Sequence, residues 1–470
     1  MIRIIDTAQE DVFALLQKRG AKQDAETQRI VSEIIQDVRQ RGDQALLENA
    51  QEYDAPGLQS IEVSEREIAT ATIEEDHHQA LKYALDRIEA FHEKQAQALF
   101  KGWSGVHAHQ DQTTAESRLH DGKGAGVYTW GSGYPGSPQL HAPQRFREGT
   151  CGQRIIPVES AGVYVPGGRA NYPSSVLMNV GPANIARVPE VFVTTPATED
   201  GTLPAAVLVA LREAKVTRAF KIGGAAAIAA FALGTETVPR ADKIVGPGNR
   251  FVNEAKRQLW GRVGLDGYAG PSEVCVFVDS TANPAWAAAD LLTQIEHSDD
   301  NVGFLIALND EDLNKVLAEV WEQLKQAPRQ NMMRKALAES LAIIAKDTAH
   351  ACEIIDAIAP EHLTIMAANP DKIMSQIRNA GCFLLGAHTP ESAADWVIGP
   401  SHTLPTAGGA RFGSPVNVMD FLKFQSISRL TLDQLDEMMP FIEAFGQMEG
   451  FSTHAKGATI RAAQTAVNSS

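Results

Sequence analysis

The segment Gln294-Ile295-Glu296-His297 contains two side chains that can bind a metal ion. It ends a run with helical spacing, so Gln294 and His297, three residues apart, lie on one helix face. An imidazole nitrogen and an amide oxygen can both serve as metal ligands. The alternative is a polar helix end with His297 near the negative end of the helix dipole. HExxH is absent, so the sequence does not indicate a zincin-type protease.

The adjacent residues Glu361 and His362 precede an apolar segment that we expect to form a strand. Successive side chains of an extended chain point to opposite sides, so the two cannot form one dyad along the strand. They can carry out two separate proton transfers in one site, and histidine suits the role of general base. The alternative is a polar loop that leads into a strand.

Two further pairs of polar residues are candidates. Asp395 and His402 lie seven residues apart in a loop that contains Gly and Pro, which is typical of a binding loop and also of an ordinary turn. Glu449 and His454 lie near the C-terminus, where isolated residues of these types are usually surface residues. Spacing alone leaves both interpretations open for each pair.

Glycine-rich turns follow two of the expected strands. Gly246-Pro-Gly-Asn249 lies between a strand and a helix, which is where a phosphate-binding turn is found, and Val165-Pro-Gly-Gly168 follows another strand. Neither is GxGxxG, so these turns leave nucleotide binding open. Four further histidines lie in a Gly-, Pro- and Ser-rich excursion at about 104–147, where we expect solvated side chains rather than a metal site: His107, His109, His120 and His141.

Short apolar segments alternate with segments of helix length from residue 161 onward, and a second such series begins at Glu273. Continuous apolar strands separated by helices indicate parallel sheets covered on both faces, and ligands of such sheets bind beyond the carboxyl ends of the strands. The strands predicted for the first series are Gly162–Val165, Val191–Thr195, Ala219–Ile222 and Lys243–Val245.

We therefore predict an α/β fold with two doubly wound, Rossmann-like parallel-sheet domains, a helical N-terminal segment and a helical C-terminal tail. The expected boundaries are 1–50 for the N-terminal helical segment, 51–163 plus 272–416 for the first Rossmann-like domain, 164–271 for the second, and 417–470 for the tail.

Composition narrows the class of protein. A chain of 470 residues, 44% hydrophobic and 21% charged, is ordinary for a globular protein with more than one domain. The formal net charge of −16 argues against nucleic-acid binding. No segment approaches the roughly 18–20 apolar residues of a membrane span, and the charged start predicts no signal peptide, so we expect a cytoplasmic protein. The four scattered cysteines are expected to be reduced and buried: Cys151, Cys275, Cys352 and Cys382.

Seven segments, in order along the chain, together resemble the histidinol dehydrogenase family: YVPGGRANYPSSVLMN, GGAAAIAAFALGTETVPRADKIVGPGNRFV, GRVGLDGYAGPSEV, LLTQIEH, APEHL, IRNAGCFLLG and GPSHTLPTAGGARF. The resemblance is loose over about residues 28–103 and close over 148–456. The family oxidises the small amino alcohol L-histidinol through the aldehyde to L-histidine, a four-electron reaction that reduces two NAD.

The resemblance also implies roles for particular residues. Zinc would orient the amine and imidazole of the substrate, and its ligands would be Gln294, His297, Asp395 and His454. His362 would be the general base for the hydroxyl, and Glu361 would activate the water that hydrates the aldehyde. The substrate contacts would be Ser272, His402 and Glu449, and the dinucleotide contacts Tyr164 and Asn249. The family forms a homodimer with exchanged tails, so Glu449 and His454 would complete the site of the other subunit.

The chain departs from the family pattern at several positions. Ala226 replaces a glutamine that contacts the cofactor, which we expect to weaken NAD binding by about 1 kcal/mol. Lys423-Phe424 replaces Lys-Arg, Ser401 replaces the asparagine of GPNH, and the excursion at 104–147 is longer than usual. The expected zinc ligands and the pair Glu361 and His362 are retained.

Two other functions remain open. A paralogue could oxidise another alcohol such as a sulfonated diol, although the carboxylate of Glu449 suits an imidazole or a cation better than a sulfonate. The other alternative is a zinc-containing binding protein without catalytic activity. Ala226 favours this interpretation, and the retained Glu361 and His362 argue against it.

Overall fold

The computed structural model describes residues 2–17, 24–104, 129–131, 150–168, 170–267 and 269–468. The chain divides into two compact units. Unit 1 comprises residues 1–95 and 158–421, and unit 2 comprises residues 96–157 and 422–470. Unit 1 contains two separate parallel sheets, so the predicted α/β class with two parallel-sheet halves is confirmed.

A six-stranded sheet forms one half of unit 1, with every strand pair parallel. Its order is β1-β11-β10-β9-β12-β13. The bounds are β1 Arg3–Asp6, β9 Glu273–Val278, β10 Val302–Ala307, β11 Leu341–Ile344, β12 His362–Met366 and β13 Cys382–Leu385.

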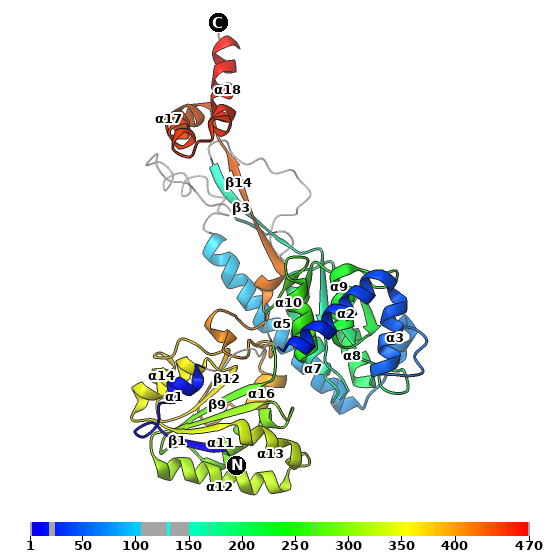
Figure 1. Cartoon of the computed structure of the whole chain (residues 1–470), viewed down its shortest axis with the longest axis vertical. Coiled ribbons are helices and arrows are strands. Elements are labelled where there is room, and N and C mark those ends of the chain that lie inside the picture. Colours follow the sequence, from blue (N-terminus) through cyan, green and yellow to red (C-terminus); the bar gives the residue numbers. More distant parts are fainter. Residues whose placement is uncertain are drawn as a thin grey trace. The chain divides into compact units, whose positions relative to one another are not determined.

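Helices cover both faces of this sheet, as Figure 1 shows. Alternate residues of β9 explain the two layers: Val274, Val276 and Val278 pack into one core, and Cys275 and Phe277 into the other. The first core contains α11 Pro284–Ile295, α12 Asp310–Gln326 and α13 Gln330–Glu339. The second contains α1 Val12–Leu16, α14 Thr348–Ile358 and α15 Pro370–Met374. The short helix α16 Glu391–Trp396 follows β13.

A five-stranded parallel sheet, in the order β6-β5-β4-β7-β8, forms the other half. Its strands are β4 Ser160–Tyr164, β5 Glu190–Thr195, β6 Arg218–Lys221, β7 Lys243–Val245 and β8 Gly264–Leu265. The connecting helices are α7 Pro173–Ile185, α8 Ala205–Glu213, α9 Gly224–Leu233 and α10 Arg250–Leu259. The four predicted strands of this series are confirmed to within about two residues.

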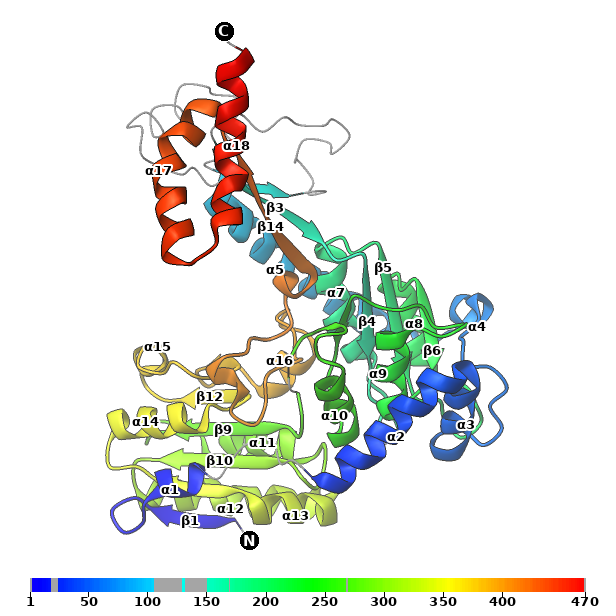
Figure 2. The same cartoon turned by 45° about the horizontal axis from the view of Figure 1, so that its top comes forward.

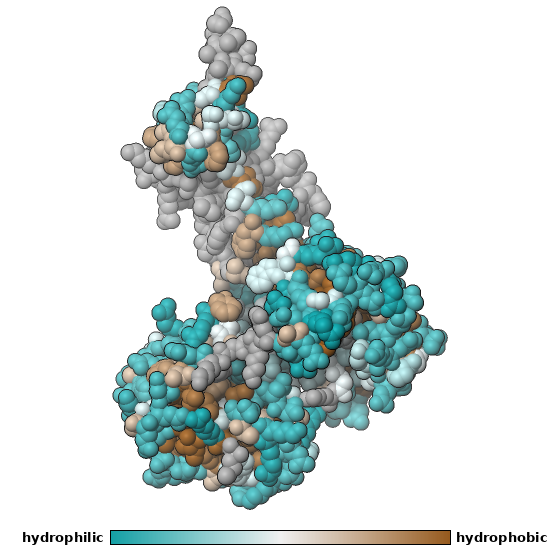
Figure 3. Space-filling model, viewed as in Figure 1, coloured by the Kyte–Doolittle hydropathy of each residue, from teal (hydrophilic) through white to brown (hydrophobic). Residues whose placement is uncertain are grey.

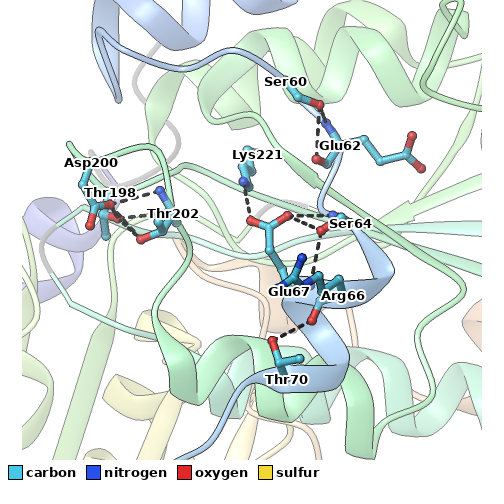
Figure 4. A network of polar contacts seen from close by, with 10 residues as sticks. All are labelled: Ser60, Glu62, Ser64, Arg66, Glu67, Thr70, Thr198, Asp200, Thr202 and Lys221. Carbon is cyan, nitrogen blue, oxygen red and sulfur yellow. Dashed lines mark hydrogen bonds and ion pairs between the residues drawn. The ribbon is translucent and has the colours of Figure 1, made fainter.

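The N-terminal helices pack on the five-stranded half. They are α2 Ala25–Arg41, α3 Asp43–Tyr53, α4 Glu65–Thr70 and α5 Glu75–Ser104. Val31, Ile35 and Leu46 share a core with α9 and α10. Figure 4 shows how α4 is fastened: Glu67 completes a capping box with Ser64 and pairs with the buried Lys221 of β6 at 2.6 Å.

The hydrogen bonds between strands differ from two of the expected domain boundaries. The limit at residue 164 would divide β4, which pairs along its whole length with β5. The segment 51–104 was expected in the first Rossmann-like domain. However, the Val63 amide donates to a carbonyl of β6, and the Lys221 amide of β6 donates to the Ile61 carbonyl. This part of the segment therefore bonds to the five-stranded half. The N-terminal segment is also not wholly helical, because β1 pairs with β11. Residues 105–128 and 132–147 of the expected excursion lie outside the described residues.

In its described residues, unit 2 combines a three-stranded sheet, in the order β14-β3-β2, with the end of α5 and two further helices. The strands are β2 Thr129–Gly131, β3 Thr150–Pro157 and β14 Leu422–Arg429, with β14 antiparallel to β3. The helices α17 Leu432–Met448 and α18 Ser452–Asn468 lie side by side (Figure 2). The C-terminal tail is therefore helical as predicted, after the strand β14.

The face of the molecule in Figure 3 is largely hydrophilic, in keeping with the net charge of −16. Among the described residues, none of the helices has the length and apolar character needed to cross a membrane.

Candidate active site

The predicted acid–base residues lie at the amino edge of the six-stranded sheet. Glu361 immediately precedes β12 and His362 is its first residue, while Ser272 precedes β9. All pairs in this sheet are parallel, so the amino ends of neighbouring strands meet at one edge. These residues therefore lie at the edge opposite to the carboxyl ends, where ligands of parallel sheets are generally expected.

Local backbone structure fixes the position of Glu361. Helix α14 ends at Ala359 in the left-handed conformation (φ 48°), and Pro360 then directs the chain into β12. The amides of Gly381 and Cys382 donate to the carbonyls of Pro360 and Glu361. A Cβ on Gly381 would lie 2.6 Å from the backbone carbonyl oxygen of Glu361, so this contact requires glycine.

Glu361 is a buried carboxyl with one firm hydrogen bond. The residue is 6% exposed, and its Oε2 accepts from the Glu273 amide at 2.8 Å. Burial raises the pKa of Glu361 to about 8, although the charge of His362 opposes this rise. A carboxyl with such a pKa can both release and accept a proton near neutral pH.

His362 is surrounded by three carboxyl groups. Its Nδ1 lies 3.4 Å from Glu391 Oε1 and 3.9 Å from Glu361 Oε2, and its Nε2 lies 3.6 Å from Asp395 Oδ1. Burial lowers the pKa of His362, but the negative charges of Glu391, Asp395 and Glu361 outweigh burial and raise it. The 3.9 Å between Glu361 Oε2 and His362 Nδ1 is within ion-pair distance, so the two side chains lie closer than expected for successive residues of a strand.

Three of the four expected metal ligands approach one another. Gln294, near the end of α11, donates through Nε2 to Asp395 Oδ2 at 3.1 Å, and both side chains are buried. Burial lowers the pKa of His297, and the charge of Asp395 opposes this effect. Asn301 fastens the end of α11, because it donates to the Gln294 carbonyl and accepts from the Ser272 amide.

The donor types and the burial fit a zinc ion. Oxygen and imidazole nitrogen ligands suit zinc. Within the described part of the chain, both ring nitrogens of His362 and both carboxyl oxygens of Glu391 are buried without a hydrogen-bond partner. Such atoms call for a further partner such as an ion or a substrate. The described residues nevertheless contain no group of three or more His, Cys, Asp and Glu arranged around a metal position.

The fourth expected ligand belongs to unit 2. His454 lies in the first turn of α18, with its ring near that of Phe451, and it is exposed. Glu449 is the C-cap of α17 and is also exposed. The roles implied for these two residues stay predictions.

The two further residues expected to contact substrate lie close to this cluster. Both ring nitrogens of His402 have partners, the Asp395 carbonyl at 2.8 Å and the Ser175 hydroxyl at 3.1 Å. A substrate contact through the ring of His402 would therefore replace one of these bonds. The carbonyl of Ser272 accepts from the amide of Val302 on the neighbouring strand.

The residues expected to contact a dinucleotide lie at the carboxyl edge of the five-stranded sheet. Tyr164 ends β4, and its buried hydroxyl accepts from the Gly224 amide at the start of α9. Asn249 is the exposed N-cap of α10, and its Oδ1 accepts from two amides of the first turn. Gly246 follows β7 with φ 115°, so the turn has the predicted strand–turn–helix position.

The departures from the family pattern have different surroundings. Ala226 is fully buried in the core shared by α9 and the N-terminal helices. Ser401 is buried and accepts from the Thr403 amide. Lys423 and Phe424 lie on β14, where both are exposed. Among the cysteines whose side chains are described, Cys275 and Cys352 are buried free thiols, as predicted, whereas the free thiol Cys382 is only half-buried.

Two cavities in unit 1 differ in their relation to the cluster. One, of about 240 Å³, adjoins His362, Cys382 and His402. The other, of about 880 Å³, lies beside α10 and β8 and contains none of the predicted site residues. The smaller cavity is the better candidate for a substrate site, because buried titratable groups line it.

Sequence reasoning missed two buried carboxyl groups in the cluster, Glu391 and Asp290. Burial raises the pKa of both, that of Asp290 to about 6. Glu391 and Asp395 are four residues apart and so share a face of α16, and this spacing could have been read from the sequence.

Comparison with known proteins gives consistent matches over nearly the whole chain. The sequence profile described as histidinol dehydrogenase matches residues 17–140 and 135–462. The histidinol dehydrogenase of Aquifex aeolicus is 37% identical, over 98% of this chain and 99% of its own, and that of Geobacter metallireducens is 39% identical, over 97% of each. The crystal structure of histidinol dehydrogenase from Elizabethkingia anophelis superposes with a TM-score of 0.82 at 30% identity and 99% coverage of both chains.

Proposed function

Since the chain belongs to the histidinol dehydrogenase family of oxidoreductases, we propose that it oxidises L-histidinol through L-histidinal to L-histidine with NAD as oxidant. The observation that carries this proposal is the buried pair Glu361 and His362 beside Asp395. These groups supply the two proton transfers that a two-step oxidation requires.

In the first step, His362 accepts the proton of the substrate hydroxyl. Its Nε2 faces Asp395, on the side of the expected metal ligands, and this nitrogen has no hydrogen-bond partner among the described residues. When its ring is neutral, an imidazole in this position can accept a proton and later return it to solvent.

In the second step, Glu361 removes a proton from the water that adds to the aldehyde. Its carboxyl is held by the Glu273 amide, and its pKa is raised to about 8 by burial. A raised pKa makes the ionised carboxylate a stronger base than an exposed glutamate. The hydrated aldehyde then loses its second hydride.

Zinc is the metal that suits the expected donor set. Gln294, His297 and Asp395 would hold it together with His454 of the partner subunit in a homodimer. When bound, zinc would orient the amine and imidazole of the substrate. Ser272, His402 and Glu449 of the partner subunit would complete the contacts to the substrate.

NAD would bind near Tyr164 and Asn249 and accept one hydride in each step. The amides at the start of α9 and α10 lie at helix N-termini, which favour negatively charged groups. We place the enzyme in the cytoplasm, as a homodimer.

The test is NADH formation by the purified protein with L-histidinol, with added zinc and after chelation. Zinc-dependent turnover to histidine would support the proposal. A folded, zinc-loaded dimer that leaves histidinol unchanged but oxidises a sulfonated diol would indicate a paralogue with another substrate. A dimer that binds zinc and oxidises neither would indicate a binding protein.

A further inference from the structure

Glu391 is a fully buried carboxyl group at the start of α16. Its backbone is held in place, because its amide donates to Asp290 Oδ1 at 3.2 Å. Both of its carboxyl oxygens lack a hydrogen-bond partner among the residues that the structure describes. A buried carboxylate without partners is costly, so its presence calls for a specific role.

The carboxyl group of Glu391 lies beside the imidazole of His362. Glu391 Oε1 lies 3.4 Å from His362 Nδ1, which is an ion-pair distance, although the N–H is not aligned as in a hydrogen bond. Catalytic hydrogen bonds are often long in a site without substrate and shorten when substrate binds.

The other two carboxyl groups around the ring are less suited to hold Nδ1. Glu361 Oε2 is farther away, at 3.9 Å, and already accepts from the Glu273 amide. Asp395 lies on the opposite side of the ring, near Nε2, and accepts from Gln294. Glu391 is therefore the acceptor that the geometry offers to Nδ1.

We propose that Glu391 is a positioning residue that accepts the Nδ1–H of His362 and so keeps Nε2 as the nitrogen that exchanges protons with substrate. This inference rests on the proposed function for its catalytic consequence. A carboxylate that holds one nitrogen of a catalytic imidazole fixes both the tautomer and the orientation of the ring. Asp290 supports this arrangement through the backbone of Glu391.

The first experiment compares Glu391→Gln with the wild-type holoenzyme. The substitution keeps the size of the side chain and removes its charge, so we expect kcat with L-histidinol to fall on the order of 100-fold while KM changes less than about threefold. Glu391→Asp, which restores a carboxylate, should recover part of kcat. Asp312→Asn, which alters a buried carboxyl group on α12, should retain wild-type kcat.

A wild-type kcat in folded Glu391→Gln would overturn the proposal. So would a loss in Glu391→Gln that appears in KM alone or in zinc content, because a merely structural role would produce it.

The second experiment does not depend on turnover. Nitrogen NMR of the zinc-loaded, ¹⁵N-histidine-labelled enzyme, at a pH where the His362 ring is neutral, reports which nitrogen carries the proton; a His362→Gln sample assigns the signal. We expect protonated Nδ1 in the wild type, and a mixture of tautomers in Glu391→Gln. Protonated Nε2 in the wild type would overturn the proposal, even if Glu391→Gln failed to fold. If L-histidinol is not a substrate, the proposed function fails while this measurement still decides the role of Glu391.

Discussion

The two parallel sheets of unit 1 present different chemistry at different edges. The amino edge of the six-stranded sheet carries buried charge, with Glu361, His362, Glu391 and Asp395 in one cluster. The carboxyl edge of the five-stranded sheet presents the Tyr164 hydroxyl and the amides at the start of α9, beside the partly buried carboxyl group of Asp54. The first suits proton transfer and the second suits a ligand that is held by hydrogen bonds at helix ends.

The difference teaches that similar parallel sheets do not place their sites alike. The usual rule for ligands rests on helix N-termini and loops beyond the carboxyl ends of the strands, and the expected dinucleotide contacts of the five-stranded half lie where this rule predicts. In the six-stranded half, the C-terminal end of α11 and the residues before β9, β10 and β12 meet at the opposite edge. Side-chain chemistry therefore locates this site better than the type of sheet.

The largest effect that would test this comparison concerns the chemical step at the amino edge of the six-stranded sheet. Glu361→Gln cannot act as a base, so we expect turnover of L-histidinal to fall about 10²–10⁴-fold, with a smaller loss for the alcohol step. Single-turnover assays with each substrate separate the two losses. Equal losses with histidinol and histidinal would remove the assigned role of Glu361.

The next effect concerns metal binding at the same edge. His297→Ala removes an expected ligand, so we expect the zinc affinity to fall at least about 100-fold, measured by metal analysis after dialysis against a weak chelator. His388→Ala, an exposed histidine beside Trp286, is the matched control and should retain zinc. Unchanged zinc content in His297→Ala would refute this ligand.

A smaller effect tests the carboxyl edge of the five-stranded sheet. In Gly246→Ala the new Cβ would lie 2.1 Å from the Tyr164 carbonyl oxygen, and φ is 115°. We expect a loss of about 2 kcal/mol or more in the free energy of unfolding, together with weaker NAD binding. Gly261→Ala, with φ 85° and no atom within 4 Å of its Cβ, should cost only about 1 kcal/mol. Equal costs for the two variants would contradict the close approach at Gly246.

The smallest effect depends on pH. Burial raises the pKa of Asp290 to about 6 in the fold, above its unfolded value, so the ionised group destabilises the protein once the pH exceeds the folded pKa. Asp290→Asn keeps the acceptor for the Glu391 amide and should raise the free energy of unfolding by about 1–3 kcal/mol near pH 8. The gain should vanish near pH 3, where the carboxyl is largely protonated in both states. Denaturant titrations at both pH values test this, and an equal gain at both would exclude the mechanism.

The fold was predictable where apolar segments were continuous. Lys243–Val245 and Val191–Thr195 were predicted from such runs and correspond to β7 and β5. The four-residue β1 was not predicted, because it is short and depends on pairing with β11, more than 330 residues away in the chain.

The site was predictable in part. Glu361 and His362 attract attention because they are adjacent, and Gln294 and His297 because they share a helix face. The contact between Asp290 and the amide of Glu391 joins residues 101 positions apart, so only the folded chain shows it. The choice of sheet edge also depends on tertiary structure, because it follows from where α11 ends.

The yield of NADH per molecule of L-histidinol tests the central claim most directly. With limiting histidinol, excess NAD and added zinc, the account predicts about two NADH for each histidinol, because each oxidation step transfers one hydride. A yield of about one NADH, with histidinal accumulating, would contradict the role given to Glu361 in the second step. If a folded, zinc-loaded enzyme produced no NADH, the assignment of histidinol oxidation to the amino edge of the six-stranded sheet would be contradicted.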